Sequence, residues 1–140
     1  MQLGRITAVT ITTPDLDKVI DIYSKYLGYR FISSTRVSAE QAKSWDAENI
    51  ENSKMIFMSP ESSNDFFFRF IEQDVDEDYV PFGTYGWNAA ELIVKDVDRS
   101  AEKLIGSPFE VIGEPADLSF TDQIRAMQIM GPSREIIYLT

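Results

Sequence analysis

The chain has 140 residues, and 23 acidic side chains against 13 basic ones give it a formal net charge of −10. This length suffices for one domain with a sizeable core, and the negative charge disfavours nucleic acid and anionic membranes as partners. The chain contains no cysteine and no histidine, which excludes thiolate nucleophiles, serine–histidine hydrolysis and histidine-bound zinc. Any acid–base chemistry must use Asp, Glu, Tyr, Lys, Arg or water.

The first half of the chain predicts a strand, a helix and three further strands. Residues 5–12 are β-branched and apolar, which is typical of a strand. An amphipathic helix follows and ends at Gly28, which suits a left-handed cap. The polar stretch 38–53 predicts a short helix inside a long connection. Further strands are expected at residues 29–36, 54–58 and 66–72.

The second half repeats this pattern after an acidic stretch at 73–86, which we interpret as a linker. A strand at 88–94 and a helix at 97–105, with Ile105 on its apolar face, are expected first. Three more strands are expected at residues 109–112, 124–130 and 135–140, with a loop at 113–122. Two copies of one βαβββ pattern predict a single pseudo-symmetric domain over 1–140, with modules 1–72 and 87–140.

The order and spacing of several short motifs carry a family resemblance across the whole chain. The motifs are residues 9–17, 23, 27–28, 92–98, 113–115 and 130–133. They resemble the vicinal oxygen chelate superfamily, the group of glyoxalase I, extradiol dioxygenases, fosfomycin resistance proteins and the bleomycin resistance protein. This resemblance implies an α+β fold in which two βαβββ modules form an open, cup-shaped barrel with the ligand in the cup.

The resemblance also implies a divalent metal, held by a His on the first strand of each module and a carboxylate on the last strand of each. At these four positions the chain has Ala8, Ala89, Arg69 and Tyr138. Such a set does not make a site for a hard cation. We therefore expect no metal and no other cofactor.

Strand alternation and the small side chains at the former metal positions predict which residues contact a ligand in the cup. The predicted ligand-binding residues are Ala8, Thr10, Thr12, Trp45, Phe67, Arg69 and Ala89. Two alternatives stay open for Arg69, a ligand contact and an internal salt bridge to Glu91. Two also stay open for Trp45, a lid over the cup and a helix anchor on the barrel exterior.

Two further residues are candidates for catalysis. Glu91 is a candidate general base, and Tyr138 is a candidate hydrogen-bond donor to a substrate oxygen. The alternatives are a solvated or paired Glu91 and a Tyr138 that packs on the core with its hydroxyl at the rim.

These observations predict a metal-independent small-molecule-binding protein of the glyoxalase/bleomycin-resistance type, which sequesters an organic ligand in its cup. One alternative is a metal-free isomerase, lyase or hydrolase using Glu91, Tyr138 and Arg69. Another is a catalytically silent subunit. The resemblance implies a homodimer. The first residues show no signal-peptide pattern and no apolar run is long enough to span a bilayer, so we expect a cytoplasmic protein.

Overall fold

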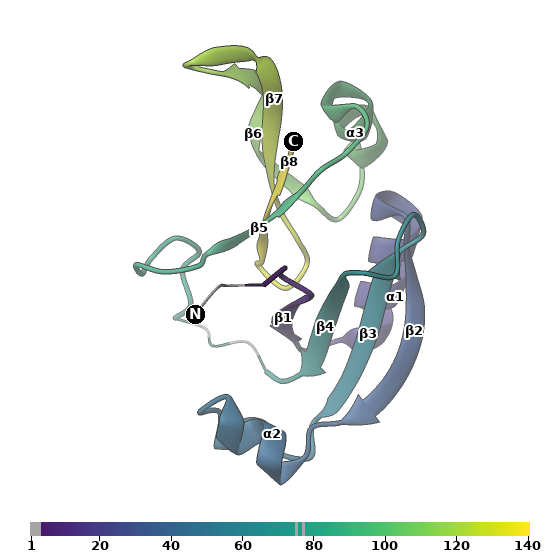
Figure 1. Cartoon of the computed structure of the whole chain (residues 1–140), viewed down its shortest axis with the longest axis vertical. Helices are drawn as coiled ribbons and strands as arrows, with labels where there is room; N and C mark the ends of the chain where they lie inside the picture. Colours follow the sequence, from purple (N-terminus) through teal and green to yellow (C-terminus); the bar gives the residue numbers. More distant parts are fainter. Residues whose placement is uncertain (1–3, 75, 77) are drawn as a thin grey trace. The chain divides into compact units, whose positions relative to one another are not determined.

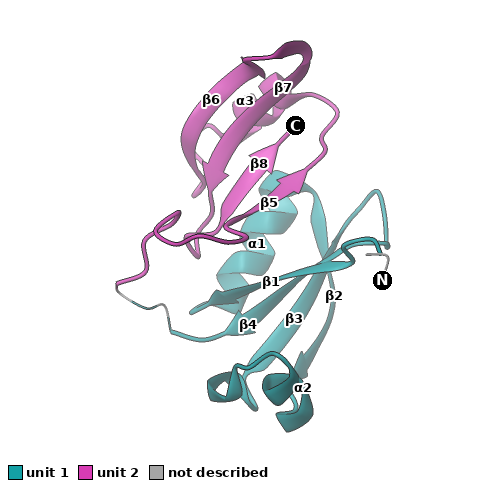
Figure 2. Cartoon of the chain, turned by 60° about the vertical axis from the view of Figure 1, so that its left-hand side comes forward, with its two compact units in different colours: residues 1–76 teal, residues 77–140 magenta. Residues whose placement is uncertain are grey.

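The computed structural model describes residues 4–74, 76 and 78–140, and the chain divides into two compact units, residues 1–76 and 77–140 (Figure 2). Each unit contains one four-stranded sheet and at least one helix, which confirms the α+β class and the two βαβββ modules. The linker predicted at 73–86 includes positions 75 and 77, which lie outside the described residues.

The first unit follows the predicted order of elements (Figure 1). Its elements are β1 (Ala8–Thr13), α1 (Leu16–Leu27), β2 (Tyr29–Arg36), α2 (Ala39–Ser44), a 3-10 helix (Glu48–Ile50), β3 (Lys54–Pro60) and β4 (Phe67–Glu72). The strands lie in the order β1-β4-β3-β2, and β1 is parallel to β4. The first and last strands of the module are therefore neighbours, although more than 50 residues separate them in the chain.

Helix α1 covers one face of this sheet. Capping residues fix both ends of the helix, and its apolar side packs on the sheet. The Asp15 side chain accepts a hydrogen bond from the backbone N–H of Lys18 at 2.9 Å and caps the helix start. Gly28 ends the helix with φ of 68°, the left-handed region that glycine adopts without strain. The buried ring of Tyr23 meets the ring of Phe70 edge-on at 4.8 Å between centroids.

The opposite face of the sheet is covered in part by α2 and the chain that follows it. A second apolar cluster lies there, formed by Val37, Ala42, Ile50, Met55 and Ile71. Trp45, Ala47 and Phe57 pack against this cluster. The long connection between β2 and β3 is thus a structured cover over one end of the sheet.

The second unit repeats the topology of the first. Its elements are β5 (Ala89–Leu92), α3 (Val97–Leu104), β6 (Glu110–Leu118), β7 (Thr121–Met130) and β8 (Ile136–Leu139). The strand order is β5-β8-β7-β6, and β5 is parallel to β8, as β1 is to β4. Asp96 caps α3 by accepting a hydrogen bond from the N–H of Arg99 at 2.9 Å, as Asp15 does for α1.

Two local predictions for this unit are wrong. Residues 113–122 form the end of a β6–β7 hairpin where a loop was expected, because register shifts accommodate Gly113 and Pro115. Proline is tolerated there because β6 is an edge strand. The side chain of Ile105 is 82% exposed, since α3 ends at Leu104 and Ile105 is its C-cap.

Among the described residues, no helix is both long enough and apolar enough to cross a membrane.

The shared helix caps predict matched effects on stability. Substitution of Asp15 or Asp96 by Ala should each lower the free energy of unfolding by about 1 kcal/mol, because a first-turn N–H loses its acceptor. Urea unfolding measures this loss. The control variants Asp15→Asn and Asp96→Asn keep an acceptor oxygen and should unfold close to the wild type. Equal losses in the Ala and Asn variants would contradict the capping role.

Tyr29 predicts a loss of stability at alkaline pH. Burial raises the pKa of the Tyr29 phenol above its ordinary value of 10.0. Above pH 10 the unfolded chain releases this proton and the folded chain retains it, so stability falls with rising pH. The loss from this group is at most about 1.4 kcal/mol per pH unit. Urea unfolding between pH 8 and 11.5 should show the decline, and Tyr29→Phe should make it shallower; an unchanged slope would contradict the assignment.

Candidate functional site

A pocket of about 280 Å³ lies in the first unit, on the face of the sheet opposite α1. This volume is just below the range of about 300–1,000 Å³ for small-molecule sites. We call it the Arg69–Trp45 pocket. It is lined by Thr10, Thr12, Trp45, Ala47, Asn49, Ile50, Arg69, Ile71 and Gln73.

Strand pairing explains why residues so distant in the chain meet here. In the parallel pair of β1 and β4, Thr10 lies beside Arg69 and Thr12 beside Ile71. Side chains two residues apart on a strand point to the same face, so these four side chains share the face opposite α1. The adjacent Phe68 and Phe70 point to α1 and are fully buried.

The wall of the pocket comes from the segment that begins at the end of α2. A capping box starts this helix, because the Ser38 hydroxyl accepts from the N–H of Gln41 and the Gln41 side chain accepts from the N–H of Ser38. The helix ends at Ser44, and Trp45 is its C-cap, whose N–H donates to the carbonyl of Gln41 at 3.0 Å. The helix end therefore places the Trp45 side chain in the pocket lining.

The guanidinium of Arg69 is held on two sides. Its Nε donates to the Thr10 hydroxyl at 2.9 Å, and its central carbon lies 4.7 Å from the centroid of the Trp45 ring. Such a cation–π contact stabilises by about 0.5–2 kcal/mol. Partial burial lowers the pKa of Arg69 from its ordinary value.

Arg69 has no carboxylate partner in its own unit. Within residues 4–74 and 76, no acidic side chain lies within ion-pair distance of it. In the same range its two terminal amino groups make no hydrogen bond. The guanidinium is thus positioned by Thr10 and Trp45, and its two terminal amino groups have no partner within the described residues of the first unit.

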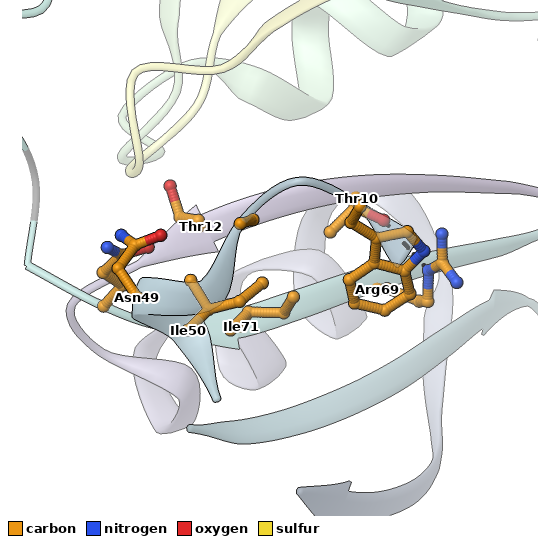
Figure 3. A pocket seen from close by; sticks show the side chains of 9 residues that line it. Thr10, Thr12, Asn49, Ile50, Arg69 and Ile71 are labelled. Carbon is orange, nitrogen blue, oxygen red and sulfur yellow. Dashed lines mark hydrogen bonds between the residues drawn. The ribbon is translucent and has the colours of Figure 1, made fainter. Parts of the chain in front are cut away.

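The pocket has an apolar floor between two polar ends. Figure 3 shows Arg69 and Thr10 at one end and Asn49 at the other, with Ile50 and Ile71 between them. Ile71 is fully buried and Ile50 nearly so. This arrangement suits an elongated molecule with an apolar body and a polar group at each end.

The structure places the predicted ligand-binding residues in three groups. Thr10, Thr12, Trp45 and Arg69 all line the Arg69–Trp45 pocket. Ala8 and Phe67 pair with one another on the same sheet face but do not line the pocket. The centroid of the Phe67 ring lies 6.3 Å from that of Phe57. Ala89 belongs to the second unit, where it pairs with Ile136.

The two catalytic candidates are neighbours in the second unit. Glu91 on β5 pairs with Tyr138 on β8, and Tyr138 pairs in turn with Gln128 on β7. The Glu91 side chain is exposed, and Tyr138 is half-buried. In residues 78–140, no hydrogen bond joins these three side chains.

Sequence reasoning missed five pocket residues: Ala47, Asn49, Ile50, Ile71 and Gln73. The alternation that selected Arg69 continues to positions 71 and 73, so Ile71 and Gln73 had a signal. The other three lie between α2 and β3, where the pattern of the chain gives no direction for a side chain. Their place is fixed by packing on the second apolar cluster.

The residues present do not fit the divalent-metal site that the family resemblance implies. Ala8 and Ala89 carry no side-chain donor atom, and Arg69 is itself a cation. Across residues 4–74, 76 and 78–140, no three Asp, Glu, His or Cys side chains are grouped so as to hold a metal ion.

Comparison with known proteins finds similarity at the level of structure. No protein-family model matches the chain, and no curated protein matches it. A glyoxalase family protein from Bacillus cereus is 18% identical with a TM-score of 0.73, over 99% of this chain and 94% of its own. TnmS3, an antibiotic binding protein from Streptomyces sp. CB03234, is 16% identical with a TM-score of 0.65, over 100% and 97% of the two chains.

A third similar structure was determined with a metal. The fosfomycin resistance protein FosX from Listeria monocytogenes, complexed with Mn(II) and sulfate, is 16% identical with a TM-score of 0.61, over 99% of this chain and 92% of its own. At identities this low, the similarity establishes the shared fold.

A double-mutant cycle tests the contact between Trp45 and Arg69. Trp45→Leu and Arg69→Met should show a coupling of about 0.5–1 kcal/mol in the free energy of unfolding, because each variant alone removes the cation–π contact. Arg69→Met combined with Phe31→Leu, an exposed ring on β2, should be additive. Additivity in both cycles would contradict the cation–π contact.

Proposed function

We propose that this chain, which has the fold of the vicinal oxygen chelate superfamily, binds a small organic molecule in the Arg69–Trp45 pocket without the help of a metal ion. The observation that carries the proposal is the pocket itself. It combines an apolar floor with a positioned guanidinium whose terminal donors have no partner in the first unit. A few oriented polar groups over an apolar surface are the usual features of a ligand site.

Binding without chemical conversion is supported by the lining of the pocket. In the part of the chain that the structure describes, this lining contains no Asp, Glu, Tyr or Lys, the remaining acid–base side chains of this chain. Arginine does not serve as a proton donor or acceptor at neutral pH, because it stays protonated. The pocket therefore has groups to hold and orient a ligand and none to move a proton.

The same fold accommodates different kinds of site in the similar structures. One is described as an antibiotic binding protein and another was solved with Mn(II). Function therefore has to be argued from the side chains of the site. Here those side chains favour a sequestering protein of the glyoxalase/bleomycin-resistance type.

A second candidate function is that of a metal-free isomerase, lyase or hydrolase using Glu91, Tyr138 and Arg69. The pairing of Glu91 with Tyr138 on adjacent strands favours it, because a base and a hydrogen-bond donor are then neighbours. Glu91→Gln distinguishes the two functions: an enzyme should lose turnover by orders of magnitude while ligand affinity survives. A catalytically silent subunit would show neither binding nor turnover.

The proposal includes a homodimer. Several large hydrophobic side chains of the second unit are strongly exposed in the single chain, including Tyr85, Trp87 and Phe120. Light scattering would report twice the 16.0 kDa mass of the chain for a dimer. A cytoplasmic location and the absence of nucleic-acid partners stay predictions, and the net charge of −10 supports the latter.

Metal-independent binding predicts that chelation leaves affinity unchanged. In Trp87→Phe, Trp45 is the only remaining tryptophan, so a single indole N–H signal reports on the pocket. Titration with 2-naphthamide, a neutral probe, should shift this signal saturably by NMR. Protein dialysed against EDTA and protein supplied with Zn²⁺ should give the same Kd. Binding that appears only with metal would contradict the proposal.

A further inference from the structure

We infer that the ligand of the Arg69–Trp45 pocket is an organic anion, whose carboxylate or similar oxyanion binds the guanidinium of Arg69 while its apolar body lies over Ile50 and Ile71. This inference rests on the proposed function, because it assigns a ligand class to the same pocket. It depends on three features of that pocket: its charge, the orientation of Arg69 and its size.

The charge of the pocket has one sign. Among the described residues of the lining, Arg69 is the only ionised side chain, and within residues 4–74 and 76 it has no ion pair. A partly desolvated cation without a counter-charge is costly, and a bound anion supplies that counter-charge. A neutral ligand leaves this cost in place, and a cationic ligand adds repulsion to it.

The orientation of the guanidinium suits a carboxylate. The Thr10 hydroxyl accepts from Nε, and the Trp45 ring lies 4.7 Å from the central carbon of the group, so two contacts position the guanidinium before a ligand arrives. The two terminal amino groups have no partner in the first unit. A planar oxyanion can accept two parallel hydrogen bonds from such a fork. Pre-positioning lowers the entropic cost of binding.

Local charge opposes the field of the whole chain. The net charge of −10 attracts cations at long range, but a charge is screened beyond about 8 Å at physiological salt. At contact distance the single guanidinium therefore decides which ligands are accepted. The pocket selects against the ions that the chain as a whole would attract.

The size of the pocket limits the anion to a small molecule. Its volume of about 280 Å³ is roughly nine times the share of one water in the liquid. One or two fused rings with a carboxylate fit this volume. Thr12, Asn49 and Gln73 offer hydroxyl and amide groups to a second polar group on such a ligand.

Three probes of one shape test the inference: 2-naphthoate, the neutral 2-naphthamide and the cationic 2-naphthylmethylamine. The Trp45 indole signal in the Trp87→Phe background is the readout. We expect 2-naphthoate to bind at least about tenfold more tightly than 2-naphthamide, because a charge-assisted pair replaces a neutral hydrogen bond. The amine should bind most weakly of the three.

Arginine variants assign this preference to one side chain. Arg69→Met should bring the affinities for 2-naphthoate and 2-naphthamide together. Arg30→Met is the matched control, because Arg30 is an exposed arginine on β2 outside the pocket lining, and it should leave the preference unchanged. Thr10→Val, which frees Nε without removing the charge, should reduce the preference severalfold and serves where Arg69→Met fails to fold.

The outcomes separate this inference from the proposed function. Equal affinities for 2-naphthoate and 2-naphthamide in the parent protein would overturn the inference that the ligand is an anion. The proposal of small-molecule binding would remain. A preference that survives both Arg69→Met and Thr10→Val would overturn the role of Arg69. Saturation by none of the three probes would overturn the proposed function together with the inference.

Discussion

The parallel pairing of β1 with β4 is the constraint on which the candidate site depends. It places Thr10 beside Arg69 and, two residues on, Thr12 beside Ile71. A slip of one residue would turn Arg69 into the core under α1 and expose Phe70. The aromatic core around Tyr23 therefore fixes the register, and the register positions the guanidinium. Packing on one face of the sheet determines the chemistry on the other.

The internal repeat shows how one topology carries two different sets of side chains. By their register, Glu91 and Tyr138 occupy in the second unit the places that Thr10 and Arg69 occupy in the first. Within residues 78–140 the second unit has no counterpart of α2. Its β6 ends at Leu118 and β7 begins at Thr121, so a short turn joins the two strands where the first unit has a long connection. Without that connection, no side chain of its own corresponds to Trp45 as a pocket wall. The first unit alone combines a basic strand residue with a covering helix.

The sequence predicted the elements better than it predicted the pocket. Residues 29–36 form a strand with the bounds expected, and Gly28 caps α1, because local patterning and conformational preference act together there. The shared strand face of Thr10, Thr12 and Arg69 could also be predicted, because this prediction needs only the two-residue period of a strand. Gly113 and Pro115 led to the wrong prediction of a loop at 113–122. The edge strand β6 tolerates both residues because its pairing with β7 is irregular there. Asn49 and Ile50 were out of reach, because tertiary packing alone brings their segment to the sheet.

The residue at one position separates the proposed anion site from the metal site that the family resemblance implies. The family resemblance assigns a carboxylate to the place where this chain has Arg69. A carboxylate there attracts a cation, whereas a guanidinium repels the cation and attracts oxyanions directly. Thr10 and Trp45 stabilise the guanidinium without neutralising it, since a hydroxyl and a ring carry no net charge. In the proposed function the ligand supplies the balancing charge, so the position to which the resemblance assigns a metal ligand would instead bind an organic anion.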